Sequence, residues 1–217
     1  MGQVNELKGF THGQIDTVLM KIGHDAGVGT AEGIRMFLAN QLVVSRPPCS
    51  WHEQGGVIYF SVRSDGTTGE GWIMRLEKNG IRIGDYAKSV LRSKDFKPTS
   101  GHLTKVAVLK GLLFEDNDRS TKKVHAFAAE RKLEAPNAEV ACLIRDAFSD
   151  EEIEVIGLWR IVTMHGPIND YGGGPRLLGV GRSDDGRWLS AYYGRPEYRW
   201  FRACGFAFAV SQVSSQT

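Results

Sequence analysis

The chain has 217 residues, of which 41% are hydrophobic and 24% are charged, and its formal net charge is +2. This length can bury a core without metals or disulfides, and so small a charge gives no electrostatic case for binding nucleic acid or acidic membranes. Cys49, Cys142 and Cys204 form no CxxC pair and no zinc-type spacing, which favours reduced thiols over a disulfide framework or structural zinc.

The amino terminus lacks the apolar segment of a signal peptide, and no run in the chain reaches 18 apolar residues. We therefore expect neither a signal peptide nor a transmembrane helix. The location expected from the sequence is cytoplasmic.

The first 46 residues predict a helical hairpin. A capping pattern at Thr11 precedes apolar residues at helical spacing, and a second amphipathic pattern begins near Thr30. The pair Pro47-Pro48 ends this region and marks a linker. We therefore divide the chain into a hairpin over residues 1–46 and a ligand-binding domain over residues 47–217.

The next segment shows a strand followed by helices. Residues 57–62 (VIYFSV) are β-branched and aromatic and lie between glycine-containing turns, which predicts a buried strand. Capping residues at Thr67-Thr68 precede an apolar stripe that includes Trp72 and Leu76, which predicts a helix. A further short helix is expected from Asp85.

Three more helix signals follow. The acidic run at residues 115–118 lacks the glycine and glutamate of an EF-hand loop, so a helix N-terminus, where carboxylates oppose the macrodipole, is the better interpretation. Pro136 precedes apolar residues that repeat at helical spacing from Val140. Ser149 and Glu152 form a capping box for another short helix.

From residue 157 to residue 210 the pattern changes to a period of two, which is typical of strands. Near the end, Phe206 and Phe208 alternate with glycine and alanine, which predicts a central strand packed tightly against its neighbours. The expected neighbours are residues 177–180 and 188–191. Helices and strands together predict an α+β fold.

The remaining positions of this region are rich in tyrosine, serine, glycine and aspartate. Tyrosine gives a large contact area at low entropic cost, and the small polar residues adapt their hydrogen bonds, which is the chemistry of binding surfaces. The alternative is that Tyr192, Tyr193 and Tyr198 are ordinary sheet residues with solvated hydroxyls. Both interpretations remain open at this point.

The tail RLLGVGRSDDGRWLSAYYGRPEYRWFRACGFAFAV, with Gly205-Phe206 in its last strand, resembles the variable region of the variable proteins of diversity-generating retroelements. The order of elements after Trp51 is similar to that of a C-type-lectin-like domain with short antiparallel strands. In this family an error-prone reverse transcriptase diversifies selected codons while framework codons stay fixed. The resemblance implies a hypervariable ligand-binding surface over about residues 170–204, with a macromolecular ligand, most often a protein.

The resemblance also divides the tail residue by residue. The implied framework comprises Leu177, Leu178, Arg182, Trp188, Leu189, Ala191, Pro196, Trp200, Arg202 and the GFAF run. Together with Tyr171, the candidate ligand-binding residues are Gly179, Gly181, Ser183, Asp184, Asp185, Ser190, Tyr192, Tyr193, Gly194, Tyr198, Phe201, Ala203 and Cys204. The sugar-binding motifs of calcium-dependent lectins are absent from the sequence, which disfavours that activity.

Two other function classes remain as alternatives. A hydrolytic enzyme would use His165 with Asp170, although no HExxH or GxSxG motif surrounds them and a turn histidine is the better interpretation. A nucleic-acid-binding protein would use the six arginines between residues 176 and 202, which also suit a solvated face. We expect a binder without catalysis, cofactor or metal, and the oligomeric state does not follow from the sequence.

Overall fold

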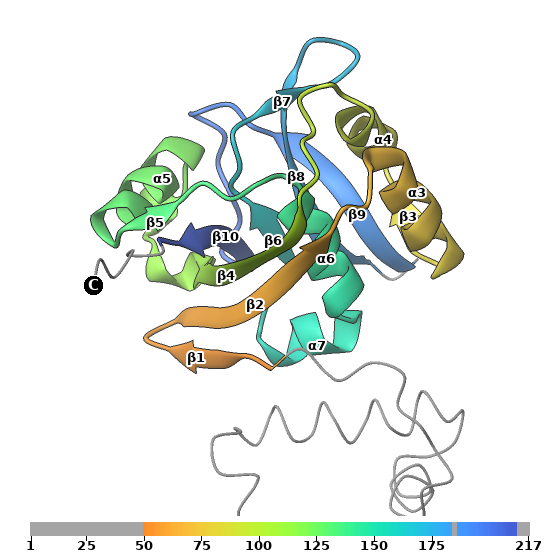
Figure 1. Ribbon diagram of the computed structural model, residues 1–217. Coiled ribbons are helices and arrows are strands. Elements are labelled where there is room, and N and C mark those ends of the chain that lie inside the picture. The colour runs from red at the N-terminus through yellow and green to blue at the C-terminus, as the bar shows by residue number, and fades with distance from the viewer. Residues whose placement is uncertain (1–49, 184–185, 212–217) are drawn as a thin grey trace, which may run out of the picture. The chain divides into compact units, whose positions relative to one another are not determined.

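Figure 1 shows the computed structural model, which describes residues 50–183 and 186–211. The chain divides into two compact units, Met1–His52 and Glu53–Thr217. The helical hairpin expected over residues 1–46 lies outside the described residues. Asp184 and Asp185, which were expected to contact a ligand, also lie outside them.

A mixed sheet of ten strands forms the centre of the second unit, with the order β1-β2-β4-β10-β6-β8-β9-β3. β5 pairs with β10, and β7 pairs with β8. The strands are β1 (His52–Gln54), β2 (Val57–Asp65), β3 (Arg82–Ile83), β4 (Ser100–Lys110), β5 (Leu133–Glu134), β6 (Arg160–Thr163), β7 (Ile168–Asn169), β8 (Pro175–Ser183), β9 (Gly186–Tyr193) and β10 (Cys204–Val210).

Five α-helices and two short 3-10 helices accompany the sheet in the described part of the chain. They are α3 (Gly69–Lys78), α4 (Asp85–Leu91), η1 (Gly111–Leu113), η2 (Asp116–Asp118), α5 (Thr121–Glu130), α6 (Glu139–Ala147) and α7 (Asp150–Val155). Among the residues described, no helix has both the length and the apolar character needed to cross a membrane. The presence of both helices and a mixed sheet confirms the expected α+β class.

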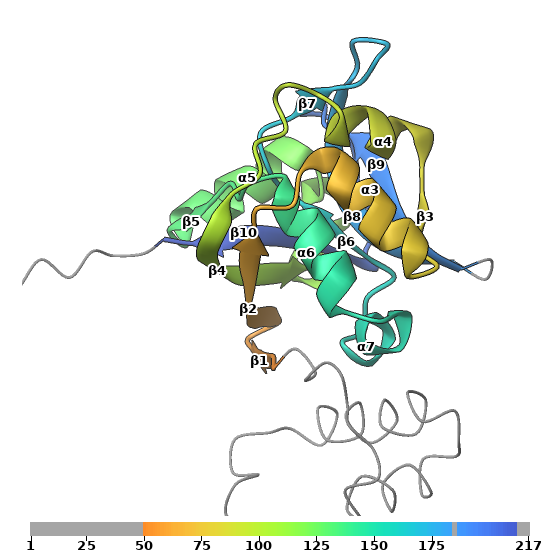
Figure 2. The ribbon, with the colours of Figure 1, turned by 45° about the vertical axis from the view of Figure 1, so that its right-hand side comes forward.

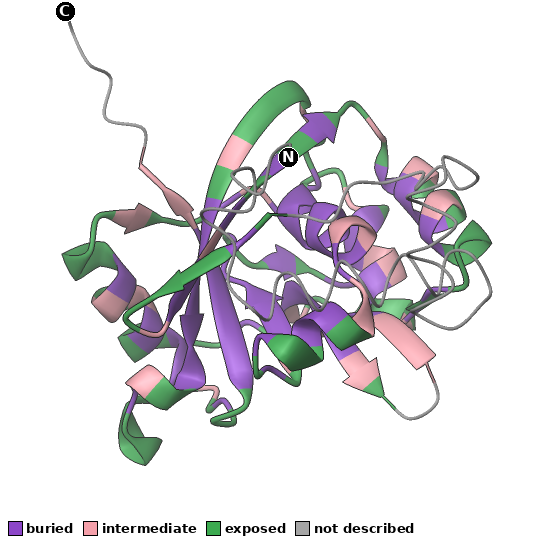
Figure 3. Ribbon diagram, turned by 90° about the horizontal axis from the view of Figure 1, so that it is seen from below, coloured by how far each residue is buried: buried purple, intermediate pink, exposed green. Residues whose placement is uncertain are grey.

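Helices cover both faces of the sheet (Figure 2). Side chains alternate along β2, so that Val57 joins the hydrophobic cluster that includes Val124 of α5. Phe60 points to the opposite face and packs on Phe148, just after α6, with ring centroids 4.8 Å apart. Figure 3 shows buried residues along the central strands and on the inner sides of the helices. The domain thus has an apolar core on each face of one sheet.

Several local predictions are confirmed. The expected strand at residues 57–62 lies within β2, and α3, α4, α6 and α7 form where their patterns place them. The Thr68 hydroxyl accepts a hydrogen bond from the Gly71 amide at 3.2 Å. Ser149 and Glu152 form the expected capping box at the start of α7. These helix ends are fixed by interactions local in sequence, which explains why the sequence alone reveals them.

The acidic run at residues 115–118 differs from the expectation. Most of it forms η2, and α5 begins later, at Thr121, with Ser120 as its N-cap. The Ser120 hydroxyl accepts a hydrogen bond from the Lys123 amide at 3.4 Å and so caps α5. Asp118 instead makes an ion pair with the Lys123 side chain at 2.5 Å.

β10 is a central strand, as predicted, but its neighbours are not those expected. It pairs antiparallel with β4 and parallel with β6. Residues 177–180 lie in β8, which pairs with β6, and residues 188–191 lie in β9, which is one strand further away. The expectation of short antiparallel strands is therefore wrong for β6 and β10. The β8–β9 hairpin occupies one edge of β6 and leaves the other edge to β10.

Tight packing around β10 gives a testable prediction. A Cβ on Gly205 would lie 2.6 Å from Leu158 Cδ1 and 2.6 Å from Val108 Cγ1. We expect Gly205→Ala to lower the free energy of unfolding by about 1–3 kcal/mol in urea titrations. Gly166→Ala is the matched control, because a Cβ there meets no atom within 4 Å. Neither glycine has a positive φ. Equal effects of the two substitutions would contradict close packing at Gly205.

Candidate functional site

Two tyrosines contact one arginine where α4, β7, β8 and β9 meet, and two further tyrosines pack against them. α4 and β7 lie side by side at the top of Figure 1. We call Tyr86, Tyr171, Arg176, Tyr193 and Tyr198 the tyrosine–arginine cluster. Tyr86 comes from α4, Tyr171 from the turn after β7, Arg176 from β8 and Tyr193 from the end of β9. Tyr198 lies in the loop that leads towards β10.

A buried ion pair stands at the centre of the cluster. Arg176 Nε donates to Asp170 Oδ2 at 2.5 Å, and both residues are buried. Asp170 Oδ1 accepts the amides of Gly172 and Gly174 at 2.8 and 3.1 Å. The hydrogen bond from Arg176 lowers the pKa of Asp170 below its usual value, so the carboxylate is charged at neutral pH. One carboxylate thus fixes both the arginine and the turn that carries Tyr171.

The arginine in turn positions the tyrosine rings. Its guanidinium carbon lies 4.0 Å from the ring centroid of Tyr86 and 4.2 Å from that of Tyr193, which are cation–π distances. Tyr171 stacks on Tyr86 with centroids 5.4 Å apart and an interplanar angle of 11°. The Tyr171 amide also donates to Ser89 Oγ at 2.8 Å. Tyr86, Tyr171 and Tyr193 remain 42%, 75% and 45% exposed. The rings are therefore held in place and still accessible to a ligand.

Ring contacts continue from this surface into the core. Tyr193 and Tyr198 have centroids 5.9 Å apart, and Tyr198 packs edge-on against Trp200 at 4.7 Å. Trp200 is buried and contacts Phe206 of β10 at 6.0 Å. The exposed rings are consequently anchored to the central strand by packed aromatic side chains.

Glycines of β8 make room for Tyr192 on the neighbouring strand. A Cβ on Gly179 would lie 3.0 Å from Tyr192 Cε2 and 2.7 Å from the carbonyl oxygen of Ile161. A Cβ on Gly181 would lie 3.3 Å from the Tyr192 hydroxyl. Tyr192 is half-buried, and burial raises the pKa of its phenol. Gly179 and Gly181 are buried beneath this ring, away from the exposed rings of the cluster. The expectation that they contact a ligand directly stays a prediction.

The other candidate residues fall into three groups. Gly194 and Cys204 are buried, and the expectation that they contact a ligand stays a prediction. Ser183, Phe201 and Ala203 are exposed, but they lie at the β8–β9 turn or in the turn before β10, outside the cluster. Ser190 is half-buried and hydrogen-bonded to Tyr192. Of the predicted residues, the structure brings together Tyr171, Tyr193 and Tyr198.

Sequence reasoning missed two members of the cluster. Tyr86 lies far from the tail in sequence, on a helix whose pattern indicates only which of its residues face the core. Arg176 was considered only as one of six charges, because nothing in the sequence shows that it is buried against Asp170. The available signal was the short spacing of Asp170 and Arg176 across a glycine-rich turn.

His165 and Asp170, which the hydrolase alternative would use, both form hydrogen bonds inside the protein. His165 is buried, its Nδ1 hydrogen-bonds to the Gly166 carbonyl at 2.7 Å, and its Nε2 accepts the Leu178 amide at 2.9 Å. Burial lowers the pKa of His165 to about 4, so the ring is neutral at pH 7. Asp170 binds Arg176 and the turn amides. Within the described ranges, no three His, Cys, Asp or Glu side chains group as a metal site.

The arginines of the tail are directed to different partners. Arg176 is buried, Arg182 pairs with a carboxylate of α7 at 2.8 Å, and Arg187 donates to a backbone carbonyl at the end of α3 at 2.5 Å. Arg199 donates to an amide oxygen near η2 at 3.2 Å. These four are used in intramolecular contacts on separate elements, which does not favour a shared basic face for nucleic acid.

A comparison with known protein families, curated proteins and solved structures finds no match to this chain. The tyrosine–arginine cluster forms a partly exposed aromatic surface, and the arginine at its centre is neutralised by Asp170. Such a surface can contact a ligand through ring faces and hydroxyl groups without first ordering a loop.

The buried His165 predicts a pH dependence of stability. Its pKa of about 4 in the folded chain lies below its ordinary value of 6.5, so the unfolded chain binds more protons between these values. Stability therefore falls as the pH drops from 6.5 towards 4, and this group alone should remove about 2 kcal/mol between pH 7 and pH 5. His165→Gln should flatten the profile from urea titrations. An NMR titration of His165 with a midpoint near 6.5 in the folded chain would contradict the assignment.

Proposed function

We propose that this chain is a non-catalytic binding protein whose tyrosine–arginine cluster forms the centre of a surface that recognises a protein ligand. The observation that carries the proposal is the group of exposed tyrosine rings held by the buried Asp170–Arg176 pair. Binding to a surface already in its bound geometry avoids the entropic cost of ordering side chains.

The chemistry of the cluster favours a protein ligand over a charged one. Asp170 neutralises Arg176, so the centre presents aromatic faces and hydroxyls without an unpaired charge. Tyrosine is enriched at the energetic centres of protein interfaces, which are surrounded by a polar rim. Exposed Arg195, stacked 5.7 Å from the Tyr193 centroid, and exposed Glu197 can supply part of such a rim.

We also propose that this chain is the variable protein of a diversity-generating retroelement and that its fold is C-type-lectin-like. Support comes from the distribution of burial along residues 170–204. Leu177, Leu189 and Trp200, which the resemblance assigns to the framework, are buried, whereas Tyr171 and Tyr193 are exposed. Burial does not match the division everywhere: Trp188 of the implied framework is only half-buried, and four residues of the implied variable set are buried, namely Gly179, Gly181, Gly194 and Cys204. Codons can vary without loss of the fold only where their side chains leave the core.

Removing two rings tests the binding surface. The double variant Tyr171→Ala/Tyr193→Ala should bind the partner captured by the immobilised full chain at least about 30-fold more weakly in surface plasmon resonance. The matched control is Met74→Ala, which removes a side chain that is 63% exposed on α3. Thermal unfolding of both variants should remain close to that of the parent. Equal affinity of the double variant and the control would refute the proposal that the tyrosine–arginine cluster binds the ligand.

The DNA beside the coding region tests the retroelement part separately. We expect a reverse-transcriptase gene and a near-repeat of the segment that encodes residues 177–210, with differences concentrated at adenines. Sequencing of the flanking DNA decides this. If both features are missing, the retroelement assignment fails, while the binding surface is still tested by the double variant.

A further inference from the structure

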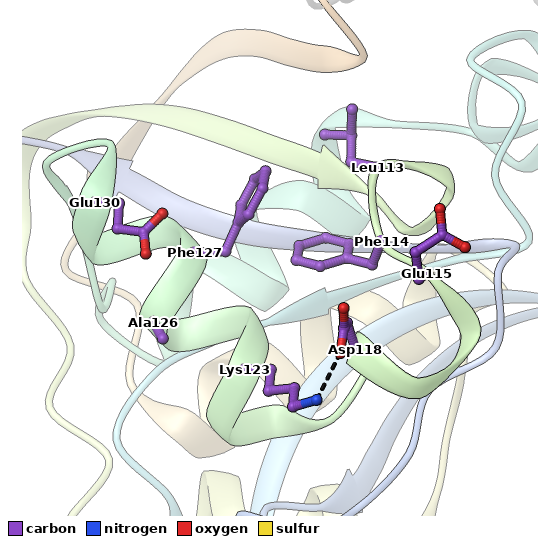
Figure 4. Close-up of a pocket in the computed structure, with 8 residues that line it drawn as sticks. All are labelled: Leu113, Phe114, Glu115, Asp118, Lys123, Ala126, Phe127 and Glu130. Atoms are coloured by element: carbon purple, nitrogen blue, oxygen red, sulfur yellow. Dashed lines mark hydrogen bonds and ion pairs between the residues drawn. The ribbon is translucent and has the colours of Figure 1, made fainter.

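A pocket of about 350 Å³ lies between α5 and the turn that joins η1 to η2 (Figure 4). It is lined by Leu113, Phe114, Glu115, Asp118, Lys123, Ala126, Phe127 and Glu130, and we call it the α5 pocket. Its volume lies within the range of about 300–1,000 Å³ of small-molecule sites. None of these residues belongs to the tyrosine–arginine cluster, so the pocket has no part in the function proposed above.

The inner wall of the α5 pocket is apolar and aromatic. Phe114 and Phe127 have ring centroids 4.6 Å apart at an interplanar angle of 55°, and Figure 4 shows Leu113 above them. Phe114 is also packed edge-on against Phe206 of the core at 5.7 Å, which fixes its position. This wall suits the apolar body of a ligand.

The charged groups around the pocket decide which ligand charge is favoured. Asp118 is neutralised by Lys123 at 2.5 Å. Glu130 has a cationic neighbour, Arg131, but at 3.9 Å the contact is an ion pair too long for a hydrogen bond. No ion pair of the Glu115 side chain occurs among the described residues. With Asp118 and Glu130 each matched by one cation, one carboxylate remains uncompensated.

The protein already places a cation against one wall of the pocket. The guanidinium carbon of Arg131 lies 3.4 Å from the centroid of the Phe127 ring, and its NH1 donates to the Phe127 carbonyl at 3.2 Å. Arg131 is not one of the residues that line the pocket. A ligand cation therefore lies away from this ring, at the carboxylates of the rim, because like charges repel.

We propose that the α5 pocket binds a small organic monocation, an ammonium or guanidinium group joined to an apolar or aromatic body. The body packs against Phe114 and Phe127, and the cation lies at the rim near Glu115 and Glu130. A second positive charge gains little, because only one carboxylate is uncompensated. The ligand is either a free amine or the basic side chain of a peptide, and the same chemistry recognises both.

Three matched probes test the charge preference on the full chain. Phenethylamine is a monocation at pH 7, 2-phenylethanol is its neutral counterpart, and 3-phenylpropionate is an anion. Titrations followed in ¹H–¹⁵N spectra should shift the amides of residues 113–118 and 123–130. We expect the amine to bind at least about fivefold more tightly than the alcohol, and the anion most weakly. Equal affinity of amine and alcohol, or no shift of these amides, overturns the proposal.

Variants then locate the two halves of the interaction. Glu115→Gln should reduce the preference for the amine over the alcohol, and Phe127→Leu should weaken both probes together. Asp95→Asn is the control, since it removes an exposed carboxylate that does not line the pocket. Retention of the full charge preference in Glu115→Gln overturns the assignment, and unfolding curves show whether each variant is folded.

A peptide probe separates the two sources of the cation. Acetyl-Phe-Arg-amide carries a guanidinium and an aromatic ring on a peptide backbone, and acetyl-Phe-citrulline-amide is its neutral counterpart. Tighter binding of the arginine peptide than of phenethylamine assigns the pocket to a protein segment, and the reverse order assigns it to a free amine. If neither cationic probe is preferred over its neutral counterpart, the proposal is wrong.

Discussion

The strand β10 is the constraint on which the rest of the domain depends. Its large side chains, Phe206 and Phe208, are buried in the cluster beneath α5, whereas Gly205 on its other face leaves no room for even a methyl group. β4 pairs with one edge and β6 with the other. β10 comes from the end of the described chain and lies between β4 and β6, so it joins the two halves of the sheet.

A buried ion pair links this scaffold to the candidate surface. Burying a charge costs free energy unless hydrogen bonds compensate, and Asp170 receives hydrogen bonds from Arg176 and from two turn amides. The arginine then makes cation–π contacts with two tyrosine rings. The tyrosine rings are thus held by strand ends and by a turn that hydrogen bonds fix in place.

The α5 pocket shows a different arrangement of the same residue types. There the aromatic rings are buried or half-buried, and the charged groups form the rim. In the tyrosine–arginine cluster the charge is buried and the rings are exposed. Two surfaces with opposite arrangements suit ligands of different chemistry, a protein face in one case and a small cation in the other.

Local rules in the sequence determined α3, α6, α7 and the alternating pattern of β10, because capping and side-chain periodicity act within a few residues. The sequence also identified Tyr171, Tyr193 and Tyr198 as surface candidates. Only the tertiary structure decided that β6 pairs parallel with β10 and that Gly179 and Gly181 lie beneath Tyr192. It also brought Tyr86 to the cluster. Strand order and contacts between distant residues depend on how whole faces are buried, which no short window of sequence records.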